Sequence, residues 1–117
     1  MAFLTYETKG RPQRAEIADT KVSIGRGRSA MVRLRHDPKI SSVHCELIRR
    51  PEGYVLKDRN SRNGTRVNGK LLGDQEVPIE HGDTVRIGDT KIRFHEYATE
   101  EKDGLLARLR SWFGRGS

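Results

Sequence analysis

The sequence contains the stretch Thr65-Arg66-Val67-Asn68-Gly69-Lys70-Leu71-Leu72, in which two short strand-like runs flank an Asn-Gly pair. Both central residues of a type I′ turn need a positive φ, so Asn68-Gly69 predicts a tight β-hairpin. Further turn signals recur at Pro51-Glu52-Gly53, Asn63-Gly64 and His81-Gly82-Asp83. Turns at such short intervals indicate an all-β protein.

Between these turns lie short runs in which apolar and polar side chains alternate. Alternation with a period of two is typical of strands in sheets that bury one face. The sequence predicts ten such strands, at residues 3–6, 14–17, 21–24, 32–34, 44–49, 54–58, 65–67, 70–72, 84–87 and 91–95. We therefore expect an antiparallel β-sandwich that occupies residues 1–98.

Residues 99–117 have a different periodicity. Apolar side chains recur there at helical spacing and share one face of a helix. They are Leu105, Leu106, Leu109, Trp112 and Phe113. Thr99 is a suitable N-cap and Gly114 a natural stop. The sequence predicts a C-terminal amphipathic α-helix that packs on the sandwich, docks a partner or lies on an anionic membrane.

The composition narrows the protein class. The 117 residues include one cysteine, Cys45, which excludes an intrachain disulfide and favours a reducing compartment. No apolar run is long enough for a transmembrane helix, and the N-terminus is too short and polar for a signal peptide. These features predict a cytoplasmic protein.

The net charge of +7 is concentrated in one part of the chain. Between Gly25 and Lys70 there are 12 Lys and Arg against 4 Asp and Glu, whereas the rest of the chain has 11 against 12. A concentrated positive field attracts nucleic acid, anionic lipid or phosphorylated protein. The alternative is a solvated basic surface without a specific partner.

Two polar motifs in this segment invite an enzymatic interpretation that their details do not favour. Gly25-Arg26-Gly27 lacks the Gly-Lys-Ser/Thr ending of a P-loop and does not open a helix. Ser41 and His44 have neither a nucleophile elbow nor a convincing third member of a triad. We predict a protein that is not an enzyme, with no catalytic residue, no metal site and no cofactor.

Four short motifs taken in order resemble the pattern of the forkhead-associated (FHA) family. They are Gly25-Arg26, Ser41-Ser42-Val43-His44, Asn63-Gly64 and Asn68-Gly69. The resemblance runs from about residue 22 to residue 94. It implies an FHA/SMAD-like β-sandwich of about eleven strands, with loops at one end that bind a phosphothreonine peptide.

The resemblance also implies roles for individual residues. Arg26 and Ser41 are expected to hold the phosphate, and Asn63 the peptide backbone. A phosphothreonine carries about −1.5 to −2 charges and three acceptor oxygens, which suit a guanidinium and a hydroxyl donor. Ser42 and Arg62 depart from the residue types usual in the family, and we include both in the predicted phosphopeptide-binding set.

Lys39 joins that set because the family often has a basic residue at its position. The remaining motif residues are expected to support the site rather than contact the ligand. They are Gly25, His44, Gly64, Asn68 and Gly69.

The sequence thus predicts non-catalytic binding of a phosphothreonine-containing protein, either a Ser/Thr kinase or its substrate, in kinase-dependent signalling or assembly. One alternative is a phosphate-independent interaction scaffold that uses the C-terminal helix. The other is a basic nucleic-acid binder, which is disfavoured because no base-stacking aromatics interleave with the arginines.

Overall fold

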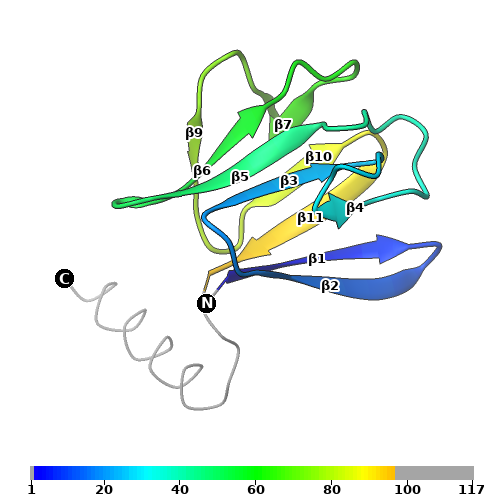
Figure 1. Ribbon diagram of the computed structural model, residues 1–117, viewed down its shortest axis with the longest axis horizontal. Helices are drawn as coiled ribbons and strands as arrows, with labels where there is room; N and C mark the ends of the chain where they lie inside the picture. Colours follow the sequence, from blue (N-terminus) through cyan, green and yellow to red (C-terminus); the bar gives the residue numbers. More distant parts are fainter. Residues whose placement is uncertain (1, 97–117) are drawn as a thin grey trace.

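Eleven strands form two sheets that pack face to face (Figure 1). A computed structural model describes residues 2–96 of the chain. The six-stranded sheet has the order β2 (Arg11–Ile17), β1 (Ala2–Thr8), β11 (Thr90–His95), β10 (Thr84–Ile87), β7 (Thr65–Val67), β8 (Lys70–Leu71). The five-stranded sheet has the order β4 (Val32–Arg33), β3 (Lys21–Gly25), β5 (Cys45–Arg50), β6 (Gly53–Asp58), β9 (Val77–Ile79).

All ten predicted strands are present, with ends that shift by at most three residues. The count of eleven confirms the number that the family resemblance implies. The strand that sequence reasoning missed is β9, whose central residue is Pro78. Proline cannot donate a ladder hydrogen bond and argues against a strand, but it is tolerated at a sheet edge, where β9 lies.

The prediction of a wholly antiparallel sandwich is wrong at one edge. Strands β3 and β4 run parallel, with Ile24 opposite Val32, while the other strand pairs within residues 2–96 are antiparallel. The loop of residues 26–31 returns the chain so that β4 starts again alongside β3. The Leu34 amide then donates to the Gly25 carbonyl at 2.7 Å and fixes this arrangement.

The core lies between the sheets and consists mainly of branched aliphatic side chains. Its fully buried members include Leu4, Ile24, Leu47, Ile92 and Phe94. Burial of each such side chain contributes about 1.5–3 kcal/mol, so these alternating positions stabilise the scaffold.

Cys45 also lies in this core. Burial raises the pKa of its thiol far above the ordinary value, so the sulfur is a packing group and not a reactive one.

The predicted hairpin is confirmed. Asn68 and Gly69 have φ values of 50° and 86°, as a type I′ turn requires, and they join β7 to β8. The helix expected within residues 99–117 lies outside the described residues and stays a prediction. Over residues 2–96 the structure contains no helix that could cross a membrane.

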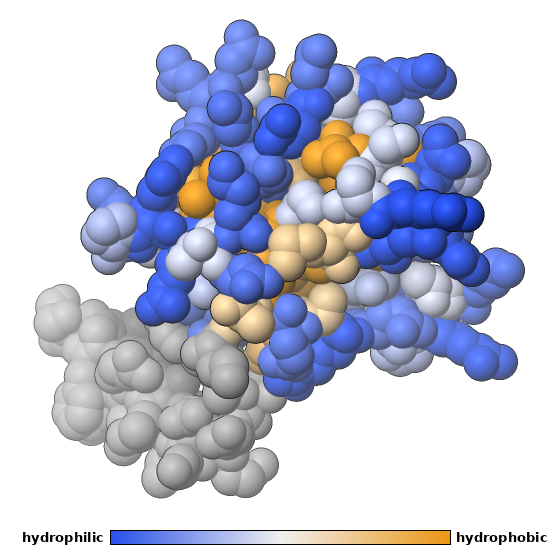
Figure 2. Space-filling view, viewed as in Figure 1, coloured by the Kyte–Doolittle hydropathy of each residue, from blue (hydrophilic) through white to orange (hydrophobic). Residues whose placement is uncertain are grey.

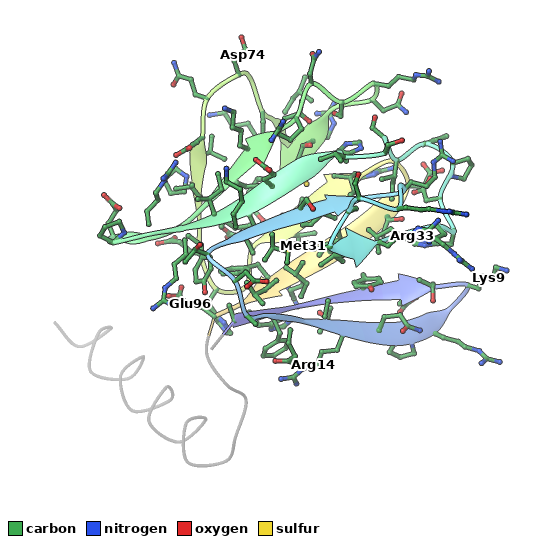
Figure 3. All side chains as sticks on the ribbon, viewed as in Figure 1. Lys9, Arg14, Met31, Arg33, Asp74 and Glu96 are labelled. Atoms are coloured by element: carbon green, nitrogen blue, oxygen red, sulfur yellow. The ribbon has the colours of Figure 1, made fainter. Side chains whose placement is uncertain are left out.

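Three loops gather at one end of the sandwich, toward the right of Figure 1. They are residues 26–31 after β3, residues 34–44 before β5, and residues 59–64 between β6 and β7. Figure 3 shows the side chain of Arg33, on β4, projecting at this end. The charge that the sequence concentrates between residues 25 and 70 is therefore presented largely by these loops.

Candidate functional site

Arg26 follows β3 directly, and its side chain is held in place from behind. Its main-chain N–H donates to the Ser41 carbonyl at 2.9 Å, and its Nε donates to the Ile40 carbonyl at 2.9 Å. The two terminal nitrogens of the exposed guanidinium have no partner within residues 2–96. A guanidinium with that edge open can donate two parallel hydrogen bonds to a phosphate.

Gly25 makes this close approach of the first two loops possible. A Cβ at this position would lie 2.2 Å from the Ser42 carbonyl oxygen and 2.9 Å from that of Ser41. Any side chain would push the loops apart and break the bonds made by the Arg26 and Gly27 amides. In the Gly-Arg motif, main-chain packing therefore requires Gly25, whereas Arg26 presents a guanidinium that can bind an anion.

His44 joins the second loop to the third from a fully buried position. Its Nδ1 accepts the Ser41 N–H at 3.0 Å, so the ring proton is on Nε2, which donates to the Gly64 carbonyl at 2.8 Å. The ring has no path to a ligand at the surface. Its contacts are those of a brace beneath the site.

Ser41 connects the same two loops at the surface. Its Oγ accepts the main-chain N–H of Arg62 at 3.0 Å, which leaves the hydroxyl hydrogen available for donation to a ligand. Ser42, the next residue, and Arg62 both have exposed side chains. The predicted binding residues Arg26, Ser41, Ser42 and Arg62 thus share one rim.

Asn63 is tied to this rim by one half of its amide. Its Nδ2 donates to the Lys39 carbonyl at 2.8 Å, while Oδ1 has no partner among the residues described. That oxygen is an acceptor for a main-chain N–H of an extended peptide.

The ammonium group of Lys39 is engaged by an acidic side chain. Its Nζ lies 3.2 Å from the carboxylate of Asp89, in the turn between β10 and β11. Lys39 therefore serves the site through its main-chain carbonyl, and Asp89 offsets its charge.

A buried carboxylate that sequence reasoning missed anchors the loop around Lys39. Asp37 accepts hydrogen bonds from the Thr90 hydroxyl at 2.8 Å and from the amides of Asp89 and Lys39 at 2.7 and 3.0 Å. Burial acts to raise the pKa of Asp37, but these hydrogen bonds outweigh it and hold that pKa below the ordinary value.

A second missed carboxylate, Asp58, shapes the third loop. It accepts the Ser61 hydroxyl at 2.5 Å, the Ser61 N–H at 3.0 Å and the buried Thr65 hydroxyl at 2.6 Å. Burial acts to raise the pKa of Asp58, but the bonds from Ser61 and Thr65 lower it overall. The Asp-x-x-Ser spacing is the one sequence signal for this turn.

The remaining motif residues fix the hairpin beside the site. Gly64 has a φ of +82°, and a Cβ there would meet the Leu71 side chain at 2.7 Å. Asn68 donates from Nδ2 to Asp83 and accepts the Thr84 N–H at Oδ1, both at 3.0 Å. Gly69 has open space around it, so its positive φ alone favours glycine.

The loop end carries more cations than its acids neutralise. Arg59 is paired with Glu46 at 2.8 Å, and Lys39 with Asp89. On the three loops, the arginines without an acidic partner in the described part of the chain are Arg26, Arg28, Arg35 and Arg62. Within residues 2–96, no group of three or more His, Cys, Asp or Glu side chains could hold a metal ion.

A rigid sandwich that presents hydrogen-bond donors and unpaired arginines on loops at one end defines an interaction module for an anionic ligand. The model of the FHA domain family matches residues 22–88. The chain belongs to this family, whose domains are phosphopeptide-binding modules and generally non-catalytic.

Curated relatives share this segment. The chain is 38% identical over 69 residues to the mouse (Mus musculus) angiogenic factor with G patch and FHA domains 1, which covers 53% of this chain and 10% of the relative. It is 39% identical over 69 residues to the FHA domain-containing protein FhaA of Mycobacterium tuberculosis (strain ATCC 25618 / H37Rv). This match covers 59% of this chain and 12% of the relative. The chain thus spans about a tenth of the length of these two relatives.

Solved structures have the same fold over most of the chain. One, from a structural and functional analysis of phosphothreonine-dependent FHA domain interactions, has a TM-score of 0.70 and 31% identity over 83% of this chain and 97% of its own. The FhaA FHA domain, complexed with the intracellular domain of Rv3910, has a TM-score of 0.70 and 28% identity, and the match covers 81% of this chain and 100% of that domain.

Proposed function

We propose that this protein binds phosphothreonine-containing segments of partner proteins and does so without catalysis. Arg26 and Ser41 hold the phosphate, Asn63 holds the peptide backbone, and Ser42 and Arg62 flank them. The partner is a phosphorylated protein, a Ser/Thr kinase or its substrate, so binding follows kinase activity.

The observation that carries this proposal is the fixation of the Arg26 guanidinium. Its Nε is used by the Ile40 carbonyl, so the terminal nitrogens are oriented before a ligand arrives. The Ser41 hydroxyl is likewise oriented by the Arg62 N–H. Donors that are already positioned lower the entropic cost of binding a dianion.

Preference for phosphothreonine over phosphoserine follows from one extra methyl group. Burying a methyl contributes about 0.8 kcal/mol, which corresponds to about fourfold in affinity. The neighbour at 31% identity comes from an analysis of phosphothreonine-dependent FHA domain interactions, which supports phosphothreonine as the ligand.

The test uses a degenerate pool of fluorescent peptides with a central phosphothreonine, and matched pools with phosphoserine or threonine. We expect the phosphothreonine pool to bind most tightly in fluorescence anisotropy, and the threonine pool to show no saturable binding. Arg26→Ala should lower affinity about 10- to 100-fold, the value of lost hydrogen bonds to a charged group.

Arg49→Ala is the matched control, because this substitution removes the same charge and Arg49 lies at the end of β5 that is remote from the loops. It should change affinity by less than about twofold, as expected for a distant, screened charge. Equal affinity for the three pools, or equal losses in the two variants, would refute the proposal.

A further inference from the structure

The outer face of the six-stranded sheet carries cations placed opposite one another by the strand register. Arg86 on β10 is paired with Lys91 on β11 and with Arg66 on β7. Directly paired residues of antiparallel strands share a face, with Cβ atoms about 4.5–5.5 Å apart. These three side chains, here called the cation ladder, therefore form one row across three strands.

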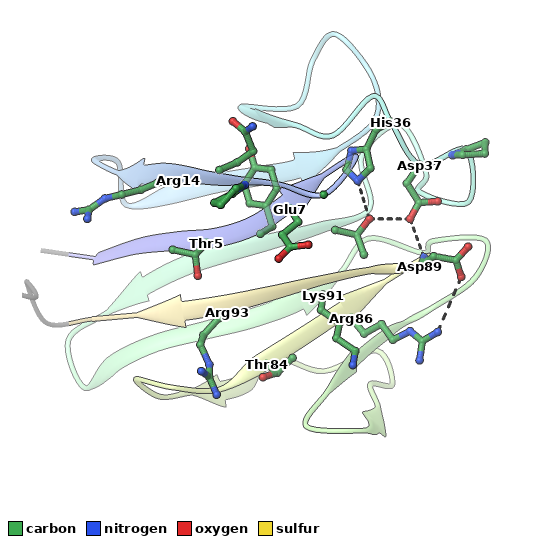
Figure 4. A pocket seen from close by; sticks show the side chains of 16 residues that line it. Thr5, Glu7, Arg14, His36, Asp37, Thr84, Arg86, Asp89, Lys91 and Arg93 are labelled. Atoms are coloured by element: carbon green, nitrogen blue, oxygen red, sulfur yellow. Dashed lines mark hydrogen bonds and ion pairs between the residues drawn. The ribbon is translucent and has the colours of Figure 1, made fainter.

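Two more arginines lie in the next row of the same face. Thr5 on β1 is paired with Arg14 on one side and with Arg93 on the other. Figure 4 shows Arg14, Arg93, Lys91 and Arg86 around a groove across β2, β1, β11 and β10. The groove has a volume of about 1110 Å³, enough for a segment of polypeptide.

Acidic side chains offset only part of this charge. Glu16 forms an ion pair with Arg14, and Asp89 lies 4.0 Å from Arg86 while it also pairs with Lys39. Glu7 lines the groove. Arg66, Lys91 and Arg93 have no acidic partner in the described part of the molecule.

Like charges directly opposite on neighbouring strands destabilise a sheet. The five-stranded sheet avoids this arrangement, because Glu46 is paired with Lys57 on one side and with Ser23 on the other. In Figure 2, viewed with β3 and β5 in front, hydrophobic and neutral atoms occupy the middle of the surface within a hydrophilic rim. The cation ladder is thus a local feature of one face and not a property of the whole surface.

We propose that the cation ladder and its groove form a second binding surface, for an extended acidic segment of a partner protein. Outward side chains along one strand, such as Arg93 and Lys91, are about 6.6–6.8 Å apart, and the same spacing separates alternate residues of an extended peptide. In a segment that runs along β11, carboxylates at alternate positions would therefore meet Lys91 and Arg93, with Arg86 opposite Lys91 on the neighbouring strand. Guanidinium groups suit them because they bind carboxylates through two parallel hydrogen bonds.

Nucleic acid suits this face less well. Binding of single strands relies on aromatic side chains on which bases stack. Phe3, on the outer face, is only 3% exposed, with Arg14 3.7 Å above its ring and His95 stacked at 4.5 Å. Tyr6, which lines the groove, is partly buried and packs against the core. The rows present charge without an open stacking platform.

The test is an NMR titration of the full chain with a 12-residue unphosphorylated peptide of alternating Glu and Ser. We expect amide shifts centred on β7, β10 and β11 rather than on the three loops. A peptide of the same composition with its glutamates in one block should bind at least about threefold more weakly, because fewer carboxylates match the strand repeat.

The triple variant Arg66→Gln, Arg86→Gln, Lys91→Gln should lose at least about tenfold in affinity for the alternating peptide, because it removes three cations that would form charge-assisted hydrogen bonds with the peptide carboxylates. It should keep phosphothreonine-peptide binding within about twofold, because the loops are untouched. A matched triple, Lys21→Gln, Arg49→Gln, Lys57→Gln on the five-stranded sheet, removes the same charge and should keep acidic-peptide binding within about twofold.

Three outcomes would overturn the inference. They are an absence of shifts on β7, β10 and β11, equal losses in the two triple variants, and tighter binding of a 12-nucleotide single strand to the same residues. The last outcome would assign the surface to nucleic acid.

Discussion

The loop end and the outer face of the six-stranded sheet both gather arginines, but they hold them in different ways. At the loop end, irregular backbone is fixed by polar groups beneath the surface, above all the buried His44 and Asp37 and the partly buried Asp58. On the sheet, the ladder register alone brings Arg66, Arg86 and Lys91 into one row.

This difference predicts different sensitivities to mutation. A loop site depends on atoms beneath the surface, because a lost buried hydrogen bond leaves a polar group unsatisfied. A sheet surface depends on the exposed side chains themselves, because core packing maintains the register. The predictions below test this contrast, from the largest expected effect to the smallest.

Gly25→Ala should cause the largest change. The added Cβ would lie 2.2 Å from the Ser42 carbonyl oxygen, which must move. We expect a loss of about 3 kcal/mol in the free energy of unfolding, at the upper end of overpacking effects, together with loss of phosphothreonine-peptide binding. Urea unfolding followed by circular dichroism measures the first effect, and anisotropy the second.

Gly73→Ala is the matched control. Position 73 has no atom within 4 Å of the added Cβ and no positive φ, so its stability should change by less than about 0.5 kcal/mol. If the two alanine variants were equally stable, the close approach of the first two loops would not be what requires glycine at position 25.

Asp58→Asn should have an intermediate effect. The side-chain amide would place an NH₂ donor where the carboxylate now accepts a hydrogen bond from Ser61 or Thr65. We expect this mismatch to lower the free energy of unfolding by about 2 kcal/mol. Asp74→Asn, at an exposed position visible in Figure 3, should leave stability unchanged.

Asp58 also predicts a pH dependence. Its pKa in the folded protein lies below the ordinary value of 3.8, so the unfolded chain binds the proton more readily. The stabilisation is fully present at neutral pH and is lost as the pH falls below about 4. Unfolding between pH 6 and pH 3 should therefore show a weaker acid dependence in Asp58→Asn than in the unmodified protein; an identical dependence would contradict this assignment.

Arg86→Thr should have the smallest effect and the opposite sign. Removing the central charge of the cation ladder relieves its repulsion with Arg66 and Lys91, which should stabilise the protein by about 0.5 kcal/mol. Lys57→Thr makes a comparable change in strand propensity on the other sheet, but it removes the cation opposite Glu46, which keeps its ion pair with Arg59, so it should not stabilise the protein. Denaturant unfolding of both variants tests the pair, and a loss of stability in Arg86→Thr would argue against strain in the row.

Sequence reasoning reached most of the fold because strand periodicity and turn chemistry are local. It predicted ten strands and the Asn68-Gly69 hairpin from neighbouring residues alone. It missed β9 because Pro78 breaks the strand pattern, and it missed the parallel pairing of β4 because direction is not encoded in a short run.

For the site, the spacing of short motifs identified Arg26, Ser41 and Asn63, which the structure brings to one end of the sandwich. The orientation of each group could not be predicted from that spacing. Lys39 is paired with Asp89, 50 residues away, and the guanidinium of Arg26 is oriented by a carbonyl oxygen, which every residue possesses.

The amino-acid sequence by itself determined the all-β class, the family motifs and the excess of positive charge, because these depend on residue types and local order. The tertiary structure alone decided where that charge is presented. Register places Arg66 of β7 beside Arg86 of β10, although these strands are separated along the chain, and places Lys91 on the other side of Arg86. Such pairings are selected by burial of the opposite face of each strand, a property of the assembled sheets and not of any single segment.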